Sequence, residues 1–156
     1  DRRLLEEVGG APDGVRDFTP EERMRYEYDL LGFSPEHHLL AYLRPRLAAA
    51  GFVPSSDLVR LPPGRLVKVG GLPVRPHRPP TKTGRTIVFL SLEDEAGLAE
   101  VTIFEGTYQR YGRLLFTDPC PPLAVEGKLE RRDKAVSVIA RRVDTLYRAL
   151  EPSWPA

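Results

Sequence analysis

Residues 88–104 read VFLSLEDEAGLAEVTIF, and this stretch decides the fold. Apolar side chains alternate with other types on both sides of Asp94-Glu95-Ala96-Gly97, a turn sequence whose glycine suits a positive φ. The period of two predicts strands at residues 86–93 and 98–104 that pair as a hairpin. The side chains expected to fill the core are Val88, Leu90, Leu92, Val101 and Ile103.

Further strands are predicted on both sides of this hairpin. Residues 66–74 alternate in the same way and contain Gly70-Gly71, a pair that favours a bend within a strand. Downstream, residues 105–115 show a helical pattern, and residues 123–129 and 135–143 form a second hairpin that turns at residues 131–134. Three strands, a helix and two strands are the order of the five-stranded OB barrel. The predicted fold class is therefore mainly β with α, a five-stranded OB-fold barrel preceded by a small helical extension.

The first third of the chain is predicted to be helical. Thr19-Pro20-Glu21-Glu22 is a helix start with a capping box, and Gly32 ends that helix. A second helix follows Ser34-Pro35-Glu36 and ends at Gly51; its apolar stripe is expected to be kinked or interrupted by Pro45. We therefore divide the chain into a helical extension at residues 1–58, the OB domain at 59–147 and a tail at 148–156.

Composition narrows the class of protein. The chain has 156 residues and a mass of 17.5 kDa. Of its residues, 41% are hydrophobic and 29% are charged, as in a globular domain of ordinary size. Its single cysteine, Cys120, excludes an internal disulfide, and no apolar run approaches the roughly 20 residues that span a membrane. These features favour a cytoplasmic protein with no membrane partner. Because the sequence starts at Asp1 without a leader, we expect it to be a piece of a longer chain.

The charges are unevenly distributed along the sequence. No acidic residue lies between Asp57 and Glu93, whereas basic residues are frequent there: Arg60, Arg65, Lys68, Arg75, Arg78, Lys82 and Arg85. Such a run favours a polyanionic partner, although a solvated basic surface would look the same in the sequence.

The outward face of the central hairpin adds aromatic rings to this charge. Alternation directs one set of side chains away from the core, namely Phe89 and Ser91 on the second strand and Glu100, Thr102 and Phe104 on the third. OB barrels bind single-stranded nucleic acid on this face, with bases stacked on exposed rings. The predicted nucleic-acid-binding residues are Lys68, Arg75, Arg78, Lys82, Arg85, Phe89, Ser91, Thr102 and Phe104. The alternative is that the two phenylalanines pack beneath the helices around Leu39 and Leu43.

Several stretches resemble the C-terminal OB domain of bacterial DNA polymerase III alpha subunits. They are residues 78–84 (RPPTKTG), 88–97 (VFLSLEDEAG) and 100–104 (EVTIF), with residues 28–34 (YDLLGFS) upstream and Val125-Glu126-Gly127 downstream. The family usually has His-Pro where this chain has His37-His38, a departure from the family pattern. Because the chain stops soon after Val143, it looks closer to the error-prone, damage-tolerant branch than to the replicative one.

The resemblance implies a module that binds single-stranded template DNA and carries no polymerase active site, its partners being the rest of the parent polymerase and possible accessory proteins. Two alternatives remain open. One is a protein-interaction module whose barrel face docks a polymerase domain or accessory factor. The other is an RNA-binding barrel of the anticodon-binding type, because aspartyl- and lysyl-type tRNA synthetases have a similar hairpin.

No cofactor, metal site or catalytic group is predicted. Neighbouring carboxylates at Glu93, Asp94 and Glu95 would point to opposite faces of a strand, so a hairpin turn explains them better than a metal cluster. His37, His77 and Cys120 lack the spacing of zinc ligands, and no pairing of a nucleophile with a base is apparent.

Overall fold

The computed structural model describes residues 38–117, 119–152 and 154. The predicted helix at residues 19–32 and the His37 position lie outside the described residues. The described elements are, in chain order, α3 (His38–Ala49), the 3-10 helix η2 (Ser55–Arg60), β1 (Leu66–His77), β2 (Ile87–Asp94), β3 (Gly97–Phe104), α4 (Glu105–Leu115), β4 (Leu123–Arg132), β5 (Ala135–Thr145) and α5 (Leu146–Ala149).

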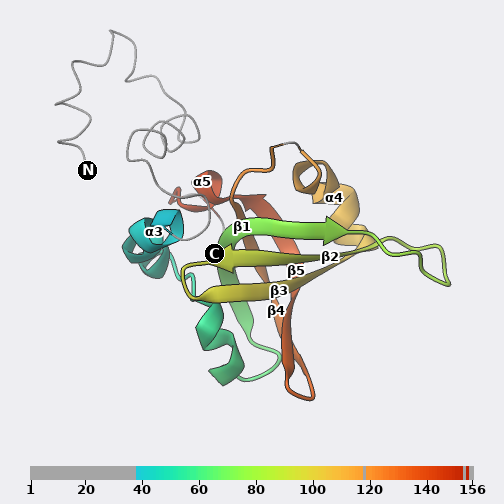
Figure 1. Ribbon diagram of the computed structural model, residues 1–156, viewed down its shortest axis with the longest axis horizontal. Coiled ribbons are helices and arrows are strands. Elements are labelled where there is room, and N and C mark those ends of the chain that lie inside the picture. The colour runs from blue at the N-terminus through green and yellow to red at the C-terminus, as the bar shows by residue number, and fades with distance from the viewer. Residues whose placement is uncertain (1–37, 118, 153, 155–156) are drawn as a thin grey trace, which may run out of the picture. The chain divides into compact units, whose positions relative to one another are not determined.

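The strands form a closed barrel in the order β1-β2-β3-β5-β4 (Figure 1). All pairings are antiparallel except β3 with β5, where Val101 pairs with Val138 and Thr102 with Ile139. The helix α4 lies in sequence between β3 and β4. The predicted order of strands and helix is confirmed, and this closed arrangement is the OB fold.

β1 belongs to two sides of the barrel and bends at its glycine pair. Residues Leu66 to Gly71 pair with β4, whereas Leu72 and the residues after it pair with β2. A Cβ atom at Gly71 would lie 2.6 Å from the carbonyl oxygen of Glu93, so a side chain there would collide with the backbone of β2. The bend predicted at Gly70-Gly71 is therefore the point at which the strand changes partners.

β1 is longer than the sequence predicts. It continues past Val74 to His77, through a register irregularity that includes Arg75 at φ +50. Alternation of side chains cannot reveal such a bulge, because one residue in the left-handed region shifts the pattern that follows.

The barrel is filled by the side chains that alternation assigned to it. Val88, Leu90, Leu92, Val101 and Ile103 are all buried in one core cluster, which the strands β4 and β5 and the buried Leu115 of α4 complete. Full burial of an aliphatic side chain of this size contributes about 1.5–3 kcal/mol to stability.

The helix α3 packs a leucine stripe inward and runs through Pro45. Leu39, Leu40, Leu43 and Leu47 are buried, as predicted. Of the kink or interruption expected at Pro45, the interruption is wrong, because α3 continues to Ala49 as one helix; the kink stays a prediction. Ala41 and Pro45 are both exposed, so water can bond the Ala41 carbonyl that lacks a proline N–H donor. α3 ends at Ala49, and Gly51, two residues later, has a φ of +89.

Residues at both boundaries of the predicted OB domain are packed into the structure. Leu58 of η2 belongs to the core cluster, and Phe52 forms a β-bridge with Lys68. After β5, Leu146, Tyr147 and Ala149 of α5 are buried. The boundaries at residues 59 and 147 remain predictions. No described helix has the length and apolar character to cross a membrane.

Candidate nucleic-acid interface

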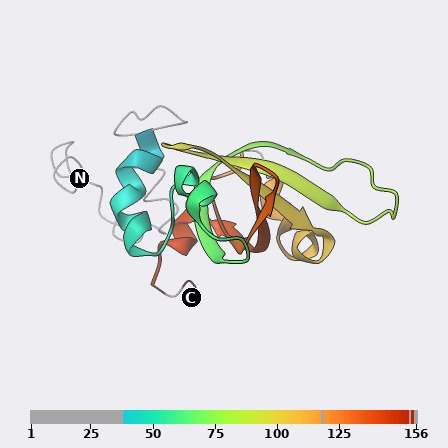
Figure 2. The same cartoon turned by 90° about the horizontal axis from the view of Figure 1, so that it is seen from below.

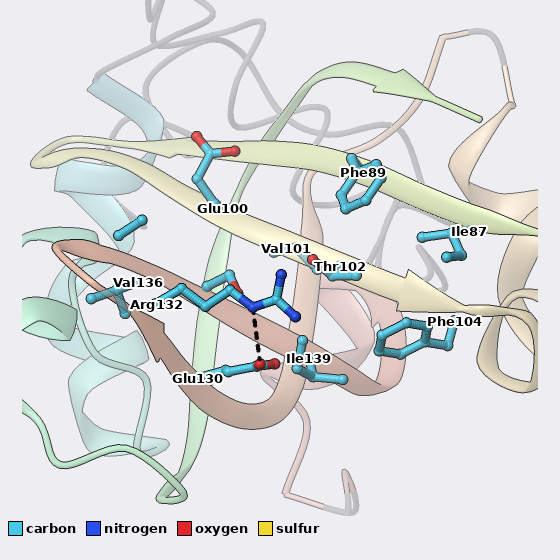
Figure 3. A pocket seen from close by; sticks show the side chains of 12 residues that line it. Ile87, Phe89, Glu100, Val101, Thr102, Phe104, Glu130, Arg132, Val136 and Ile139 are labelled. Carbon is cyan, nitrogen blue, oxygen red and sulfur yellow. Dashed lines mark ion pairs between the residues drawn. The ribbon is translucent and has the colours of Figure 1, made fainter. Parts of the chain in front are cut away.

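A cavity of about 440 Å³ lies between the two hairpins of the barrel (Figure 3). One side is formed by β2 and β3, and the other by the ends of β4 and β5 around their turn. The residues that line it are Ile87, Phe89, Glu100, Val101, Thr102, Phe104, Glu130, Arg132, Ala135, Val136, Ser137 and Ile139. The volume is in the range of about 300–1,000 Å³ that is typical of ligand sites.

Two phenylalanine rings lie on the β2–β3 side of this cavity. Phe89 pairs with Thr102 across the two strands and Phe104 pairs with Ile87, so both rings are on the outward face, as predicted. Phe89 is 39% exposed and Phe104 is 48% exposed, so neither ring is buried beneath a helix. The ring of His77 lies beside that of Phe89, with centroids 5.7 Å apart and planes tilted by 35°. Flat, accessible rings of this kind can stack on bases.

A serine and a glutamate continue the same face toward the β2–β3 turn. Ser91 lies opposite Glu100, and its hydroxyl is 2.9 Å from each oxygen of the Glu100 carboxylate. Thr102 lies between Glu100 and Phe104 on the outward face of β3 and lines the cavity. The predicted site residue Ser91 is therefore hydrogen-bonded to Glu100, the acidic residue that alternation places on the same outward face as Thr102.

The β4–β5 side contains residues that the sequence analysis did not select. Figure 3 shows the Arg132 side chain extending between the hairpins, and its Nε lies 3.7 Å from Oε1 of Glu130. Val136 and Ile139 add apolar surface beside it. The Arg132 side chain is 88% exposed, so its ion pair with Glu130 is weak and the guanidinium is available to an anionic ligand. In the sequence, the sign of this second side is the pair Arg131-Arg132 at the predicted turn of the second hairpin.

The basic connection between β1 and β2 projects from the barrel on the side opposite to α3 in both views (Figure 1, Figure 2). Lys82 and Arg85 are exposed on it, and Arg75 is exposed at the bulge of β1. Within the connection, the Thr81 hydroxyl donates a hydrogen bond of 2.6 Å to the carbonyl of Arg85.

Arg78, at the base of this connection, is held by α4. Its Nη1 donates to the Tyr108 hydroxyl at 2.9 Å, and its guanidinium carbon lies 5.5 Å from the ring centroids of both Tyr108 and Phe116. Arg78 thus fixes the start of the connection relative to the barrel, while Lys82 and Arg85 extend further along it.

Lys68 is not brought together with the other predicted site residues. It lies in the part of β1 that pairs with β4, where its Nζ is 3.4 Å from the Ala50 carbonyl and 5.4 Å from the ring centroid of Trp154. Trp154 in turn stacks on Phe52 at 5.8 Å. The basic run in the sequence is therefore divided between two surfaces.

The acidic turn has a structural role. Asp94 is 1% exposed, and its carboxylate accepts bonds from the Ala96 and Gly97 N–H groups at 2.9 and 3.0 Å, as a turn aspartate does. In the described part of the chain, no group of three or more His, Cys, Asp or Glu residues could hold a metal ion.

Comparison with known proteins gives one clear set of relatives. No family model matches the chain. An error-prone DNA polymerase of Symbiobacterium thermophilum is 49% identical over 137 residues, which are 88% of this chain and 12% of that protein. An error-prone DNA polymerase of Anaeromyxobacter dehalogenans is 36% identical over 154 residues, 96% of this chain and 13% of that protein.

Among solved structures, the hypothetical protein ygiW from E. coli is similar with a TM-score of 0.46 and 12% identity, covering 61% of this chain and 89% of that one. The chain spans about an eighth of the length of the polymerases that it matches. The resemblance to bacterial polymerases of the error-prone branch is thus confirmed: over most of its length, this chain is similar to a segment of the error-prone DNA polymerases.

Proposed function

We propose that this chain is the single-stranded-DNA-binding OB module of an error-prone DNA polymerase, and that it positions the template strand during repair synthesis. The strand lies in the cavity between the two hairpins, with bases against Phe89 and Phe104. The polymerase chemistry belongs to other parts of the parent protein, which, with possible accessory proteins, is also the partner of this module.

The observation that carries the proposal is the pair of exposed rings in a cavity flanked by basic side chains. Phe89 and Phe104 present flat surfaces, each able to contribute about 1–3 kcal/mol per stacked base. Arg132 lies on one side of the rings, and the exposed Lys82 and Arg85 lie on the connection that leads into β2. The surface thus offers rings on which bases can stack, next to cations that can bind the phosphates. The similarity to DNA polymerases favours DNA as the ligand.

The test is a titration of the 156-residue chain into labelled oligonucleotides over a series of salt concentrations. For single-stranded DNA, the logarithm of affinity should fall with the logarithm of salt at a slope of about two to three, because each phosphate contact contributes about 0.7. Duplex of the same length should bind more weakly, because rings cannot reach stacked bases. A slope near zero, or equal affinity for duplex, would overturn the proposal. Tighter binding of RNA of the same sequence would favour the anticodon-type alternative.

A protein-docking function is the second candidate, and one observation favours it. The same cavity contains the carboxylates of Glu100 and Glu130 beside the apolar Ile87, Val136 and Ile139. Carboxylates repel phosphates, and a cavity that combines acids with apolar side chains also suits a basic, apolar peptide segment. If no oligonucleotide binds, this surface is the place to map contacts with the other polymerase domains.

A further inference from the structure

Glu100 is an acidic residue within a surface proposed to bind a polyanion. It lines the cavity from β3, on the same outward face as Thr102 and Phe104. The Ser91 hydroxyl lies 2.9 Å from each carboxylate oxygen, but a hydroxyl has one hydrogen and can donate only one bond at a time. An ionised carboxylate offers about four lone-pair sites, so most of the acceptor capacity of Glu100 remains for a ligand.

We propose that Glu100 accepts a hydrogen bond from the exocyclic amino group of a nucleobase, so that the interface prefers cytosine to uracil and thymine. This inference rests on the proposed binding of single-stranded DNA in the cavity.

The charge of Glu100 determines which part of a nucleotide can approach it. A phosphate would be repelled by Glu100, so the backbone is expected to pass nearer to the cations, which are Arg132 on β4 and the exposed Lys82 and Arg85 before β2. The base is then the part that faces Glu100. Phe89 is the ring near enough for this contact, because it lies opposite Thr102, two residues from Glu100 on β3, and a base stacked on it presents its polar edge along the surface of the sheet. Thr102 lies on β3 between Glu100 and Phe104, opposite Phe89, and so adjoins both the stacked base and the carboxylate.

The bases differ in what they present to a carboxylate. Cytosine has an amino group at position 4, which is the group that Glu and Asp accept from in direct base readout. Uracil and thymine have a carbonyl oxygen at the same position, and two facing acceptors repel each other. Cytosine and uracil are otherwise nearly the same in size and shape, so the difference at position 4 isolates the contact.

Ser91 acts as a positioning residue for this contact. A free glutamate side chain samples many rotamers, and the conformational entropy lost when binding fixes one of them reduces the favourable free energy of the contact. The bond from Ser91 holds the carboxylate above β2 and β3 before a ligand arrives. Loss of the hydroxyl should therefore reduce the discrimination between bases without removing it.

The experiment compares oligo-dC with oligo-dU of about 12 nucleotides, within the site size of an OB fold, at neutral pH where cytosine is unprotonated. The native chain should bind oligo-dC about five-fold more tightly, the lower end of what one specific contact contributes. In Glu100→Gln, the amide can donate as well as accept, so the ratio should fall to about one while oligo-dU binds more tightly than before. Ser91→Ala should give an intermediate ratio.

The matched control is Glu126→Gln, which removes the same charge from β4 at a residue that does not line the cavity. It should change both affinities together and leave their ratio intact. Equal, salt-dependent binding of the two oligonucleotides to the native chain would overturn the role of Glu100 and leave the proposed function standing. An unchanged ratio in Glu100→Gln would also overturn it. A chain that binds neither oligonucleotide would overturn the proposed function as well.

Discussion

Ser55 donates two hydrogen bonds to the buried carboxylate of Asp94, 39 residues away in the sequence. One comes from its backbone N–H at 2.8 Å and the other from its hydroxyl at 2.6 Å. The same carboxylate lies 3.4 Å from Nη2 of Arg44 on α3 and accepts from the turn that joins β2 to β3. One side chain thus ties α3, η2 and the central hairpin together.

We expect Asp94→Asn to destabilise the fold by about 2–4 kcal/mol, because an amide nitrogen would face N–H donors that the carboxylate now satisfies. The measurement is the free energy of unfolding from urea titration. Asp133→Asn is the matched control, since Asp133 is exposed at φ +53, a conformation that asparagine tolerates well. Equal effects of the two substitutions would show that the buried contacts contribute nothing specific.

Phe89→Leu and Phe104→Leu test whether the exposed rings stack on bases. Each substitution keeps most of the apolar volume but removes a contact worth about 1–3 kcal/mol, so affinity for single-stranded DNA should fall several-fold. The salt slope should not change, because no phosphate contact is lost. The melting temperature should change little for rings that are already partly exposed.

Tyr42→Leu provides the control, because this ring is 38% exposed on α3 and does not line the cavity. Its affinity for DNA should stay close to that of the native chain. A loss of stability without a loss of binding in Phe89→Leu or Phe104→Leu would show that the rings serve packing.

The barrel could be predicted from the sequence because its signals are local. Alternation marks each strand, Gly71 marks the bend, and Gly97 marks the turn of the central hairpin. The second side of the cavity could not be predicted in this way. Arg132 and Ile139 lie beside the β2–β3 face because β3 pairs in parallel with β5 when the barrel closes. The alternation of side chains within a strand does not show which other strand it will pair with.

The charged residues show a second limit of sequence reasoning. Lys68 and Arg85 belong to one basic run, yet β1 changes partner at Gly71 and so carries Lys68 to the side of Trp154. A count of charges cannot show which part of a bent strand faces the ligand.

Gly71→Ala should destabilise the chain by about 2 kcal/mol or more, because the new methyl group would meet the backbone of Glu93 and neither strand can move without breaking the ladder. Gly106→Ala is the opposite case. A Cβ atom at Gly106 meets nothing within 4 Å, and alanine in a helix is favoured over glycine by about 0.5–1 kcal/mol in the interior and less in the first turn. Thermal melts of the two variants should shift in opposite directions.

Cys120 should make stability depend on pH in the alkaline range. Burial raises the pKa of the Cys120 thiol, whose Sγ also donates to the Leu114 carbonyl at 3.3 Å. The folded chain keeps its proton to higher pH than the unfolded chain, so this contribution is complete below the unfolded pKa, about 8.5, and is lost as pH rises through the folded value. Urea midpoints should therefore fall more steeply above that pH for the native chain than for Cys120→Ser, which has no ionising group there. Parallel pH profiles would contradict this.

The salt dependence of DNA binding should distinguish the two basic surfaces. Lys82→Ala and Arg85→Ala remove exposed cations from the β1–β2 connection, so each should lower affinity and reduce the salt slope by about 0.7 if its phosphate contact is complete. Lys68→Ala removes the same charge from the surface that contains Ala50 and Trp154, so we expect an unchanged slope and a lower melting temperature. Fluorescence anisotropy of labelled single strands at several salt concentrations measures all three slopes. A reduced slope in Lys68→Ala would place the strand across the β1–β4 side of the barrel, and unchanged slopes in the other two variants would remove the connection from the binding surface.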